Sequence, residues 1–194
     1  METFILAGLG NPGPTYQWTR HNAGFLFLDR LADREHISVS RKAFSGLAGE
    51  WVFGSHRLIL LKPQTFMNLS GRAVMQALQF YKLPLSSLIV VHDELDLPYG
   101  SLRIKQGGGH GGHNGLRSII EMLGKGDFLR IRIGIGKPLH GDTTSYVLGK
   151  ISPPEMEHIA AIFDGGYDAL KTLMTEGVPK SMSLYNNRNY LPTK

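Results

Sequence analysis

The 194-residue sequence contains no cysteine, which excludes disulfide bonds, thiolate nucleophiles and thiolate-bound zinc. It also has no apolar run approaching the roughly 20 residues that a membrane-spanning helix needs. The short apolar run at the N-terminus is interrupted by glycine and proline well before it reaches the length of a signal-peptide core. We therefore expect a protein of the reducing cytoplasm that does not associate with a membrane.

Charge is also scarce, because charged residues make up 19% of the sequence and 21 Lys+Arg against 16 Asp+Glu leave a formal net charge of +5. A basic bias of this size helps to recruit a polyanion such as nucleic acid, although an ordinary solvated surface accounts for it equally well. Hydrophobic residues make up 42% of the chain, which is enough to form a core. Since no linker, repeat or low-complexity tract divides the chain, we predict one globular domain over residues 1–194.

Two kinds of segment alternate along the chain. Short apolar or alternating runs predict strands at residues 3–8, 47–53, 57–61, 87–91, 101–105 and 129–135. Amphipathic segments predict helices beginning near residues 22, 70, 116 and 153, and the last of these is expected to be the final helix and to end near 175. Asn22 and Ser70 stand where N-caps are expected. The alternation indicates an α/β fold, and the hairpin-like neighbours at 47–53 and 57–61 indicate a mixed sheet.

The segment Gly8–Gly13 reads G-x-G-x-x-G after a predicted strand, which is the dinucleotide-binding pattern. Such a site needs a helix that begins within the glycines, so that its amides meet the pyrophosphate. Here Pro12 and Pro14 delay the helix to about residue 22, and Asp29, the carboxylate at the expected spacing, falls inside that helix. We interpret the segment as a loop, with a tight turn and a nucleotide site as the alternatives.

A histidine and a carboxylate stand at the ends of predicted elements. His21 lies at the junction of the first loop and helix, and Asp93 follows the strand at 87–91, where open α/β sheets build sites. A carboxylate there can accept from one imidazole nitrogen while the other faces substrate, and it also stabilises the imidazolium. A surface histidine and a structural aspartate in an acidic turn are the alternative, because the sequence does not show that the two touch.

Three asparagines fall in three loops beside predicted sheet ends, namely Asn11, Asn68 and Asn114. Together they suggest a neutral pocket lined with amides that can donate to and accept from a peptide group. Each asparagine alone is better explained as a turn or cap residue.

Two other chemistries are disfavoured by spacing. His92, Asp93, His110 and His113 invite a metal interpretation, but two of the histidines lie in a glycine-rich stretch and no H-E-x-x-H helix is present, so we predict no metal. A serine esterase of the common α/β type lacks its G-x-S-x-G signature.

Basic residues recur in the central and later segments, at Lys62, Arg103, Lys105, Arg130, Arg132 and Lys137. In the alternating strand at 129–135, Arg130 and Arg132 are expected to point outward on one face. Such a set can bind phosphates, and a solvated sheet edge protected by charge is the alternative.

Taken together, GLGNPGPTYQWTRHNAG, KPQTFMNLSG, VVHDELDLPYG and KQGGGHGGHNGL, with the later RIRIGIGKP, closely resemble the bacterial-type peptidyl-tRNA hydrolase family. Several long motifs in one order are far more specific than any single motif. The resemblance runs from Thr3 to about Lys150. Beyond that point the chain matches only in helical character, and Tyr99 stands where the family often has proline.

The resemblance implies a single α/β domain with a twisted mixed sheet flanked by helices. It also implies an esterase that frees tRNA from its peptide without a metal or cofactor. His21 would be the catalytic base, Asp93 its orienting partner, and Asn11 the residue that distinguishes blocked from free aminoacyl ends.

The remaining roles implied by the resemblance concern substrate binding. Asn68 and Asn114 would hold the peptide and the attacking water, Tyr16, Phe66 and Met67 would shape the groove for the tRNA end, and His113 would be auxiliary. Arg103, Lys105 and Arg132 would bind tRNA phosphates. The expected partner is the acceptor end of peptidyl-tRNA, and we expect a monomer. A non-catalytic tRNA-binding module and a nucleotide-cofactor enzyme are the rival hypotheses.

Overall fold

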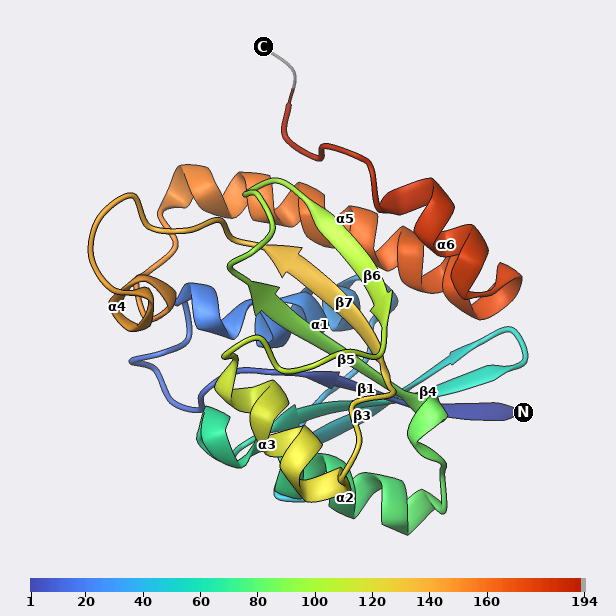
Figure 1. The fold of residues 1–194 in the computed structure, drawn as a ribbon. Helices are drawn as coiled ribbons and strands as arrows, with labels where there is room; N and C mark the ends of the chain where they lie inside the picture. The colour runs from blue at the N-terminus through green and yellow to red at the C-terminus, as the bar shows by residue number, and fades with distance from the viewer. Residues whose placement is uncertain (193–194) are drawn as a thin grey trace.

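A computed structural model describes residues 1–192, in which a central sheet separates two layers of helices (Figure 1). Residues 193 and 194, the last two of the predicted domain, lie outside the described residues. The strands are β1 (Glu2–Gly8), β2 (Arg41–Ala43), β3 (Gly46–Phe53), β4 (His56–Pro63), β5 (Leu88–Glu94), β6 (Leu102–Gln106) and β7 (Leu129–Gly134). The α-helices are α1 (Ala23–Glu35), α2 (Ser70–Tyr81), α3 (Asn114–Leu123), α4 (Thr143–Val147), α5 (Pro153–Glu176) and α6 (Val178–Tyr185). Short 3-10 turns cover Arg20–Asn22, Met67–Leu69 and Leu85–Ser87.

The sheet has seven strands in the order β2-β3-β4-β1-β5-β7-β6. The inner strands β4, β1, β5 and β7 run parallel, whereas β2, β3 and β6 pair antiparallel with their neighbours. This confirms the predicted fold class, a mixed sheet flanked by helices. Among residues 1–192, no helix combines the length and the apolar character that crossing a membrane requires.

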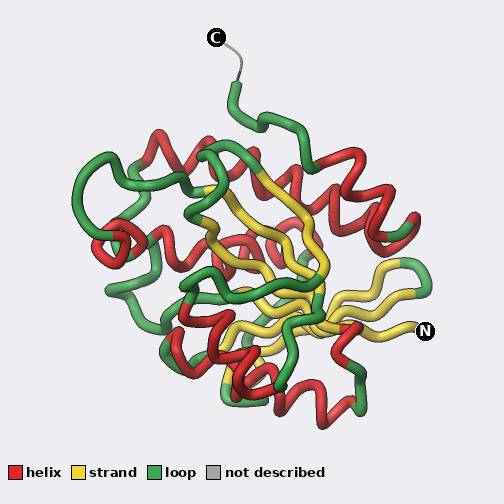
Figure 2. The backbone as a smooth tube through the Cα atoms, in the orientation of Figure 1, coloured by secondary structure: helices red, strands yellow, loops and turns green. Residues whose placement is uncertain are grey.

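The central strands are buried on both faces, as expected for strands with helices above and below (Figure 2). On β1, Leu6 faces the core that contains α1 and α5 residues, while Ile5 and Ala7 face the core formed with α2 and α3. On β5, Ile89 and Val91 again join the first core and Leu88 and Val90 the second. The period of two along each strand therefore divides the apolar side chains between two cores.

The glycines after β1 let helix α1 approach the sheet closely. A Cβ at Gly24 would lie 2.3 Å from the Leu9 nitrogen and 2.4 Å from the Val91 carbonyl oxygen, so only glycine fits. A Cβ at Gly10 would lie 2.6 Å from the Phe25 ring. Gly8 and Gly10 of the G-x-G-x-x-G pattern thus serve helix packing, whereas Gly13 has φ +99° and open space around it. The late start of α1 agrees with interpreting this segment as a loop.

Neither predicted N-cap side chain caps its helix, although Asn22 does occupy the N-cap position of α1. The Asn22 side chain accepts from the Asn11 nitrogen and donates to the Asn11 carbonyl, at 2.9 Å each, and makes no cap bond to α1. The Ser70 hydroxyl donates to the Met67 carbonyl at 2.8 Å, because Ser70 is already inside α2. In both places the side chain forms its hydrogen bonds with the chain segment before the helix, and not with the first amides of the helix.

Three short elements escaped prediction, namely β2, α4 and α6. The long helix was expected at 153–175 and is α5, which starts with a capping box between Ser152 and Glu155. It is not the final helix, because Gly177 ends it and α6 follows at once. The side-chain amide of Asn186, just after α6, pairs with the backbone of Ile104 on the edge strand β6.

Candidate active site

The site lies at the carboxyl ends of the adjacent parallel strands β1 and β5. The chain leaves β1 toward α1 on one face of the sheet, and after β5 and β6 it reaches α3 on the other face. Such a divergence opens a crevice beyond the strand ends, which is where ligands bind in open α/β sheets. A cleft of about 510 Å³ opens there, and residues from both loops line it.

The cleft gathers most of the site residues predicted from the sequence. Its lining includes Asn11, Tyr16, His21, Phe66, Met67, Asn68, Asp93, His113 and Asn114. These nine come from four separate segments that only the fold brings together. Arg103, Lys105 and Arg132 are not part of the lining.

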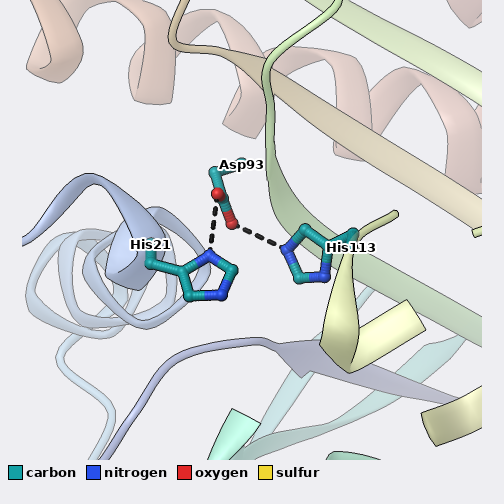
Figure 3. Close-up of side chains that lie close together, drawn as sticks. All are labelled: His21, Asp93 and His113. Atoms are coloured by element: carbon teal, nitrogen blue, oxygen red, sulfur yellow. Dashed lines mark hydrogen bonds and ion pairs between the residues drawn. The ribbon is translucent and has the colours of Figure 1, made fainter. Parts of the chain in front are cut away.

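His21 and Asp93 are in direct contact (Figure 3), with 2.9 Å between His21 Nδ1 and Asp93 Oδ2. Both are buried, with exposed fractions of 8% and 2%. The contact follows from the close approach of α1, because Gly24 packs against Val91 and therefore brings His21, just before the helix, beside the end of β5. The carboxylate accepts the Nδ1 proton, which leaves His21 Nε2 with a lone pair.

His113 holds the other oxygen of the same carboxylate, with 2.8 Å between its Nε2 and Asp93 Oδ1 (Figure 3). Its Nδ1 accepts from the backbone nitrogens of Gly115 and Leu116, at 3.1 and 3.4 Å, so His113 caps α3. Because backbone amides only donate, Nδ1 must be the acceptor and Nε2 must carry the proton. Asp93 is thus fixed from two sides, a partnership that spacing along the sequence did not reveal.

Burial and charge oppose each other at this pair. Burial alone would raise the pKa of Asp93, but the charge that His21 can carry and the hydrogen bonds from His21 and His113 hold that pKa well below its usual range. Burial opposes a charge on His21, yet the Asp93 carboxylate raises the pKa of His21 above its ordinary value. Asp93 is therefore ionised at neutral pH, and it favours the imidazolium that a base forms when it takes a proton.

His92 lies behind the site with 1% of its surface exposed. Its Nδ1 donates to the Asp93 carbonyl at 2.7 Å, and its ring meets the His113 ring edge-on at 5.1 Å. Burial lowers the pKa of His92 to about 3, so this ring is neutral. It supports His113 without reaching the cleft lining.

The three groups His21, Asp93 and His113 place their potential ligand atoms within 4.8 Å of one another, so among residues 1–192 they are also the residues best placed to hold a metal. They are not the set that the sequence suggested. His92 is bound to the Asp93 carbonyl, and His110 Nδ1 accepts from the Gly112 nitrogen. A metal at the three groups would have to displace both hydrogen bonds on Asp93.

Asn11 has a fixed orientation. Its side-chain oxygen accepts from the Met67 nitrogen at 2.7 Å, and the Asn22 side chain holds its backbone. The Asn11 amide NH₂ remains to face the cleft, so this group is a donor there. Asn68, in the turn before α2, and Asn114, the first residue of α3, are exposed at the cleft.

The segment 142–148, which carries α4 and which we call the flap, forms another wall of the cleft. Its lining residues are Thr143, Thr144, Val147 and Leu148. Arg20, the residue before His21, ties this flap down through the Tyr146 carbonyl at 3.3 Å and Glu155 at 3.0 Å. Sequence reasoning missed the flap, although Asp142 before two threonines is an N-cap signal and its side chain does cap α4.

The basic residues separate into different environments. Arg130 was predicted to point outward, and this is wrong: it is 3% exposed and donates to three backbone carbonyls. Arg132 donates twice to Glu94 Oε1, at 2.9 and 2.6 Å. Arg103 lies opposite Arg132 in the β6–β7 ladder, and Lys105 lies opposite Arg130.

Arg103 and Lys105 are exposed, and no ion pair found among residues 1–192 involves either of them. Lys62 and Lys137, the other two candidates, pair with Asp29 and Asp96. We call Arg103, Lys105 and Arg132 the basic strip. Of its three cations, two face solvent without a protein anion.

Fold and site together define an α/β protein whose cleft presents an imidazole held by a buried carboxylate, with three asparagine amides and the charged Glu94, Asp96 and Lys137 also in its lining. An imidazole held in this way is a hydrolytic arrangement. The sequence model of the family described as Peptidyl-tRNA hydrolase matches residues 5–193. The chain belongs to the peptidyl-tRNA hydrolase family. This confirms the resemblance and extends it past Lys150, where the sequence motifs ended.

Named relatives agree over the full length. The peptidyl-tRNA hydrolase of Pelobacter propionicus is 70% identical over 191 residues, covering 98% of this chain and 99% of the relative. That of Trichlorobacter lovleyi is 66% identical, with the same coverage. The crystal structure of the Acinetobacter baumannii peptidyl-tRNA hydrolase superposes with a TM-score of 0.90 at 39% identity and covers 97% of each chain.

Proposed function

We propose that the chain hydrolyses the ester bond between an N-blocked peptide and the 3′ ribose of tRNA, releasing free tRNA and peptide. The observation that carries this proposal is the 2.9 Å contact between His21 Nδ1 and Asp93 in an amide-lined cleft. Such a reaction recycles peptidyl-tRNA that has left the ribosome. We further propose that the whole chain acts as one domain, as a monomer in the cytoplasm.

His21 Nε2 acts as the general base in this proposal. It takes a proton from a water molecule as the water oxygen attacks the ester carbonyl, and Asp93 stabilises the resulting imidazolium. Collapse of the tetrahedral intermediate breaks the bond to the ribose 3′ oxygen, which takes the proton back from His21. General-base help of about 10²–10⁴-fold, together with positioning, suffices for an ester, which is more labile than a peptide bond.

Amide side chains complete the reaction site. Asn68 and Asn114 lie at the cleft with exposed side chains, where they can hold the peptide and the attacking water. One of them, or the amides of the neighbouring loops, donates to the developing oxyanion, a contribution worth a few kcal/mol in acyl-transfer sites. Tyr16, Phe66 and Met67 shape the groove for the tRNA end.

Asn11 provides selectivity for blocked ends. Because the Met67 nitrogen occupies its oxygen, Asn11 offers the cleft an NH₂ donor. An N-blocked substrate supplies an acyl carbonyl that accepts from this donor. A free aminoacyl end supplies an ammonium, which can only donate and loses hydration on entering the cleft.

Replacing Asn11 with aspartate tests this assignment. One carboxylate oxygen of Asn11→Asp can keep the bond to the Met67 nitrogen, and the other turns the donor into an anion that attracts an ammonium. We expect relative kcat/KM on unblocked aminoacyl-tRNA over N-acetylated aminoacyl-tRNA to rise about tenfold or more. Gln17→Glu, a matched amide-to-acid change outside this cleft, should leave the ratio unchanged. An unchanged ratio in Asn11→Asp would end the selectivity account.

The basic strip is proposed to bind tRNA phosphates. Arg103 and Lys105 offer exposed cations, and Arg132 can exchange Glu94 for a phosphate. Contacts of this kind position the acceptor end over the cleft without reading its sequence.

One assay tests the activity itself. The purified, chelator-treated protein is incubated with N-acetyl-aminoacyl-tRNA, and free tRNA is measured. We expect multiple turnovers that depend on His21 and Asp93. Binding without release would support a non-catalytic tRNA-binding module instead, and thermal stabilisation by NAD or ATP without release would support a nucleotide-cofactor enzyme.

A further inference from the structure

Arg130 is a buried cation that the proposed mechanism does not use. It lies on β7 with 3% of its surface exposed, and no ion pair among residues 1–192 includes it. Its guanidinium donates instead to the carbonyl oxygens of Gly108 and Gly109, at 2.5 Å each, and of Gly126, at 3.2 Å. A buried charge is costly unless it is hydrogen-bonded, and these three bonds satisfy the two terminal nitrogens, while Nε has no partner among the described residues.

The three carbonyls stand on both sides of α3. Gly108 and Gly109 lie at the start of the loop that leads into the helix, and Gly126 follows the helix. A backbone hydrogen bond of 3.0 Å from the Gly107 nitrogen to the Phe128 carbonyl joins the same two chain segments, one before α3 and one after it. Arg130 therefore ties together the two chain segments between which α3 and its N-terminal loop project.

The glycines fit around this guanidinium. A Cβ on Gly126 would lie 2.4 Å from the Gly108 carbonyl oxygen and 3.4 Å from Arg130 Nη2. Gly108 itself has φ +112°, in the region that favours glycine. The planar fork of arginine satisfies several carbonyls at once, which a lysine ammonium on a flexible stem does not reproduce.

The projecting loop delivers catalytic-site groups. It ends in His113, whose Nδ1 caps α3 and whose Nε2 donates to Asp93 at 2.8 Å, and in Asn114 at the cleft. A displacement of this loop would move the hydrogen bond that fixes Asp93 and, through it, His21. Misplacement by about 1 Å can cost about 10²-fold in rate.

We propose that Arg130 is a positioning residue: by clamping the glycine segments around α3, it sets the place of His113 and Asn114 and so the orientation of the Asp93–His21 pair. This inference rests on the proposed function for its kinetic consequence. It assigns Arg130 to catalysis rather than to the phosphate contacts suggested by its place beside Arg132.

The test compares Arg130→Gln with Arg117→Gln, an exposed arginine of α3 that lies outside the cleft lining. On N-acetyl-aminoacyl-tRNA we expect Arg130→Gln to lower kcat about tenfold or more. Its KM and the salt dependence of tRNA binding should stay within about twofold of wild type, because no phosphate contact is lost. Arg117→Gln should match wild type. A raised KM with a shallower salt slope and normal kcat would make Arg130 a phosphate ligand and overturn the proposal.

A readout without substrate separates this proposal from the proposed function. In ¹⁵N-histidine spectra, wild-type His113 should show one tautomer, with the proton on Nε2, and Arg130→Gln should show a mixture. An unchanged His113 signal would overturn the proposal even if the enzyme assay failed for every variant. If wild-type protein released no tRNA, the proposed function would fail, but the His113 spectra would still test whether Arg130 positions the loop.

Gly126→Ala covers the case in which Arg130→Gln does not fold. Its added methyl presses on the Gly108 carbonyl while Arg130 remains. We expect the same loss of kcat with KM retained, and full kcat in this variant would contradict the proposal.

Discussion

The cleft and the basic strip differ in how their side chains are held. In the cleft, both oxygens of Asp93 and the side-chain oxygen of Asn11 already have protein partners, so the geometry exists before substrate arrives. In the strip, Arg103 and Lys105 project from an edge strand without a protein anion, and Arg132 is held by Glu94. The cleft is preorganised for chemistry, whereas the strip is adaptable and suits non-specific attraction of a polyanion.

The largest expected effect comes from removing the base in the cleft. His21→Ala should slow ester release by about 10²–10⁴-fold while tRNA affinity stays within about twofold, because the strip is intact. His158→Ala, a histidine of α5 outside the cleft, is the matched control. Steady-state kinetics and filter binding measure the two quantities. Near-normal turnover in His21→Ala would remove the distinction between a chemical and a binding region.

Acid should also destabilise the protein through His92, which lies behind the cleft. Its folded pKa of about 3 lies below the unfolded value of 6.5, so the unfolded chain binds more protons between these values and stability falls as pH falls. Between pH 6.5 and 5 this amounts to about 2 kcal/mol. Asp93 contributes little in that window, since its unfolded value of 3.8 lies below it.

His21, whose folded pKa is raised, contributes stability that is fully present below 6.5 and is lost as pH rises through the folded value. It therefore does not offset the loss due to His92 between pH 6.5 and 5. Urea unfolding of His92→Gln at the two pH values should show most of this pH dependence removed. If the free energy of unfolding fell by the same amount between the two pH values in the variant and in the wild type, this would contradict the account of a neutral buried His92.

The smallest expected effects belong to the strip. Arg103→Ala should weaken tRNA binding severalfold and make the slope of log K against log salt shallower by about one, with kcat unchanged. Arg132→Ala should act in the same direction but less, because Glu94 already compensates part of its charge. Arg72→Ala, an exposed arginine of α2, is the control. Unchanged salt slopes in both strip variants would exclude phosphate binding there.

The sequence could predict where the elements and site residues lie along the chain, but not which side chains meet in the fold. The mixed α/β sheet followed from apolar runs, and His21, Asp93 and the three asparagines were marked by their positions at loop and strand ends. Tyr16, Phe66, Met67 and the role of His113 came only from the resemblance to the family. The contacts inside the cleft could not be predicted, because they depend on where chain segments meet. Asn22 was expected to cap α1 and instead locks Asn11, and His113 caps α3 while also holding Asp93.

Charge was the property hardest to interpret from sequence. Alternation along β7 placed Arg130 and Arg132 on one face, which the ladder bears out, but it could not show that glycine carbonyls bury Arg130 or that Glu94 pairs with Arg132. The flap that carries α4 was missed for a related reason. Its five helical residues are too few to produce a periodic pattern, so only the Asp142 cap marked it.

In the proposed function Asp93 tunes His21 as a general base, and the pH dependence of kcat/KM on N-acetyl-aminoacyl-tRNA tests this role most directly. Because the base must be unprotonated, the wild-type profile should rise with pH through an apparent pKa above 6.5 and then level off. Asp93→Asn removes the anion that raises this pKa, so its rising limb should move to lower pH and its plateau should fall about 10²-fold. Rising limbs that coincide in the two proteins, or a wild-type rate independent of pH, would contradict the account.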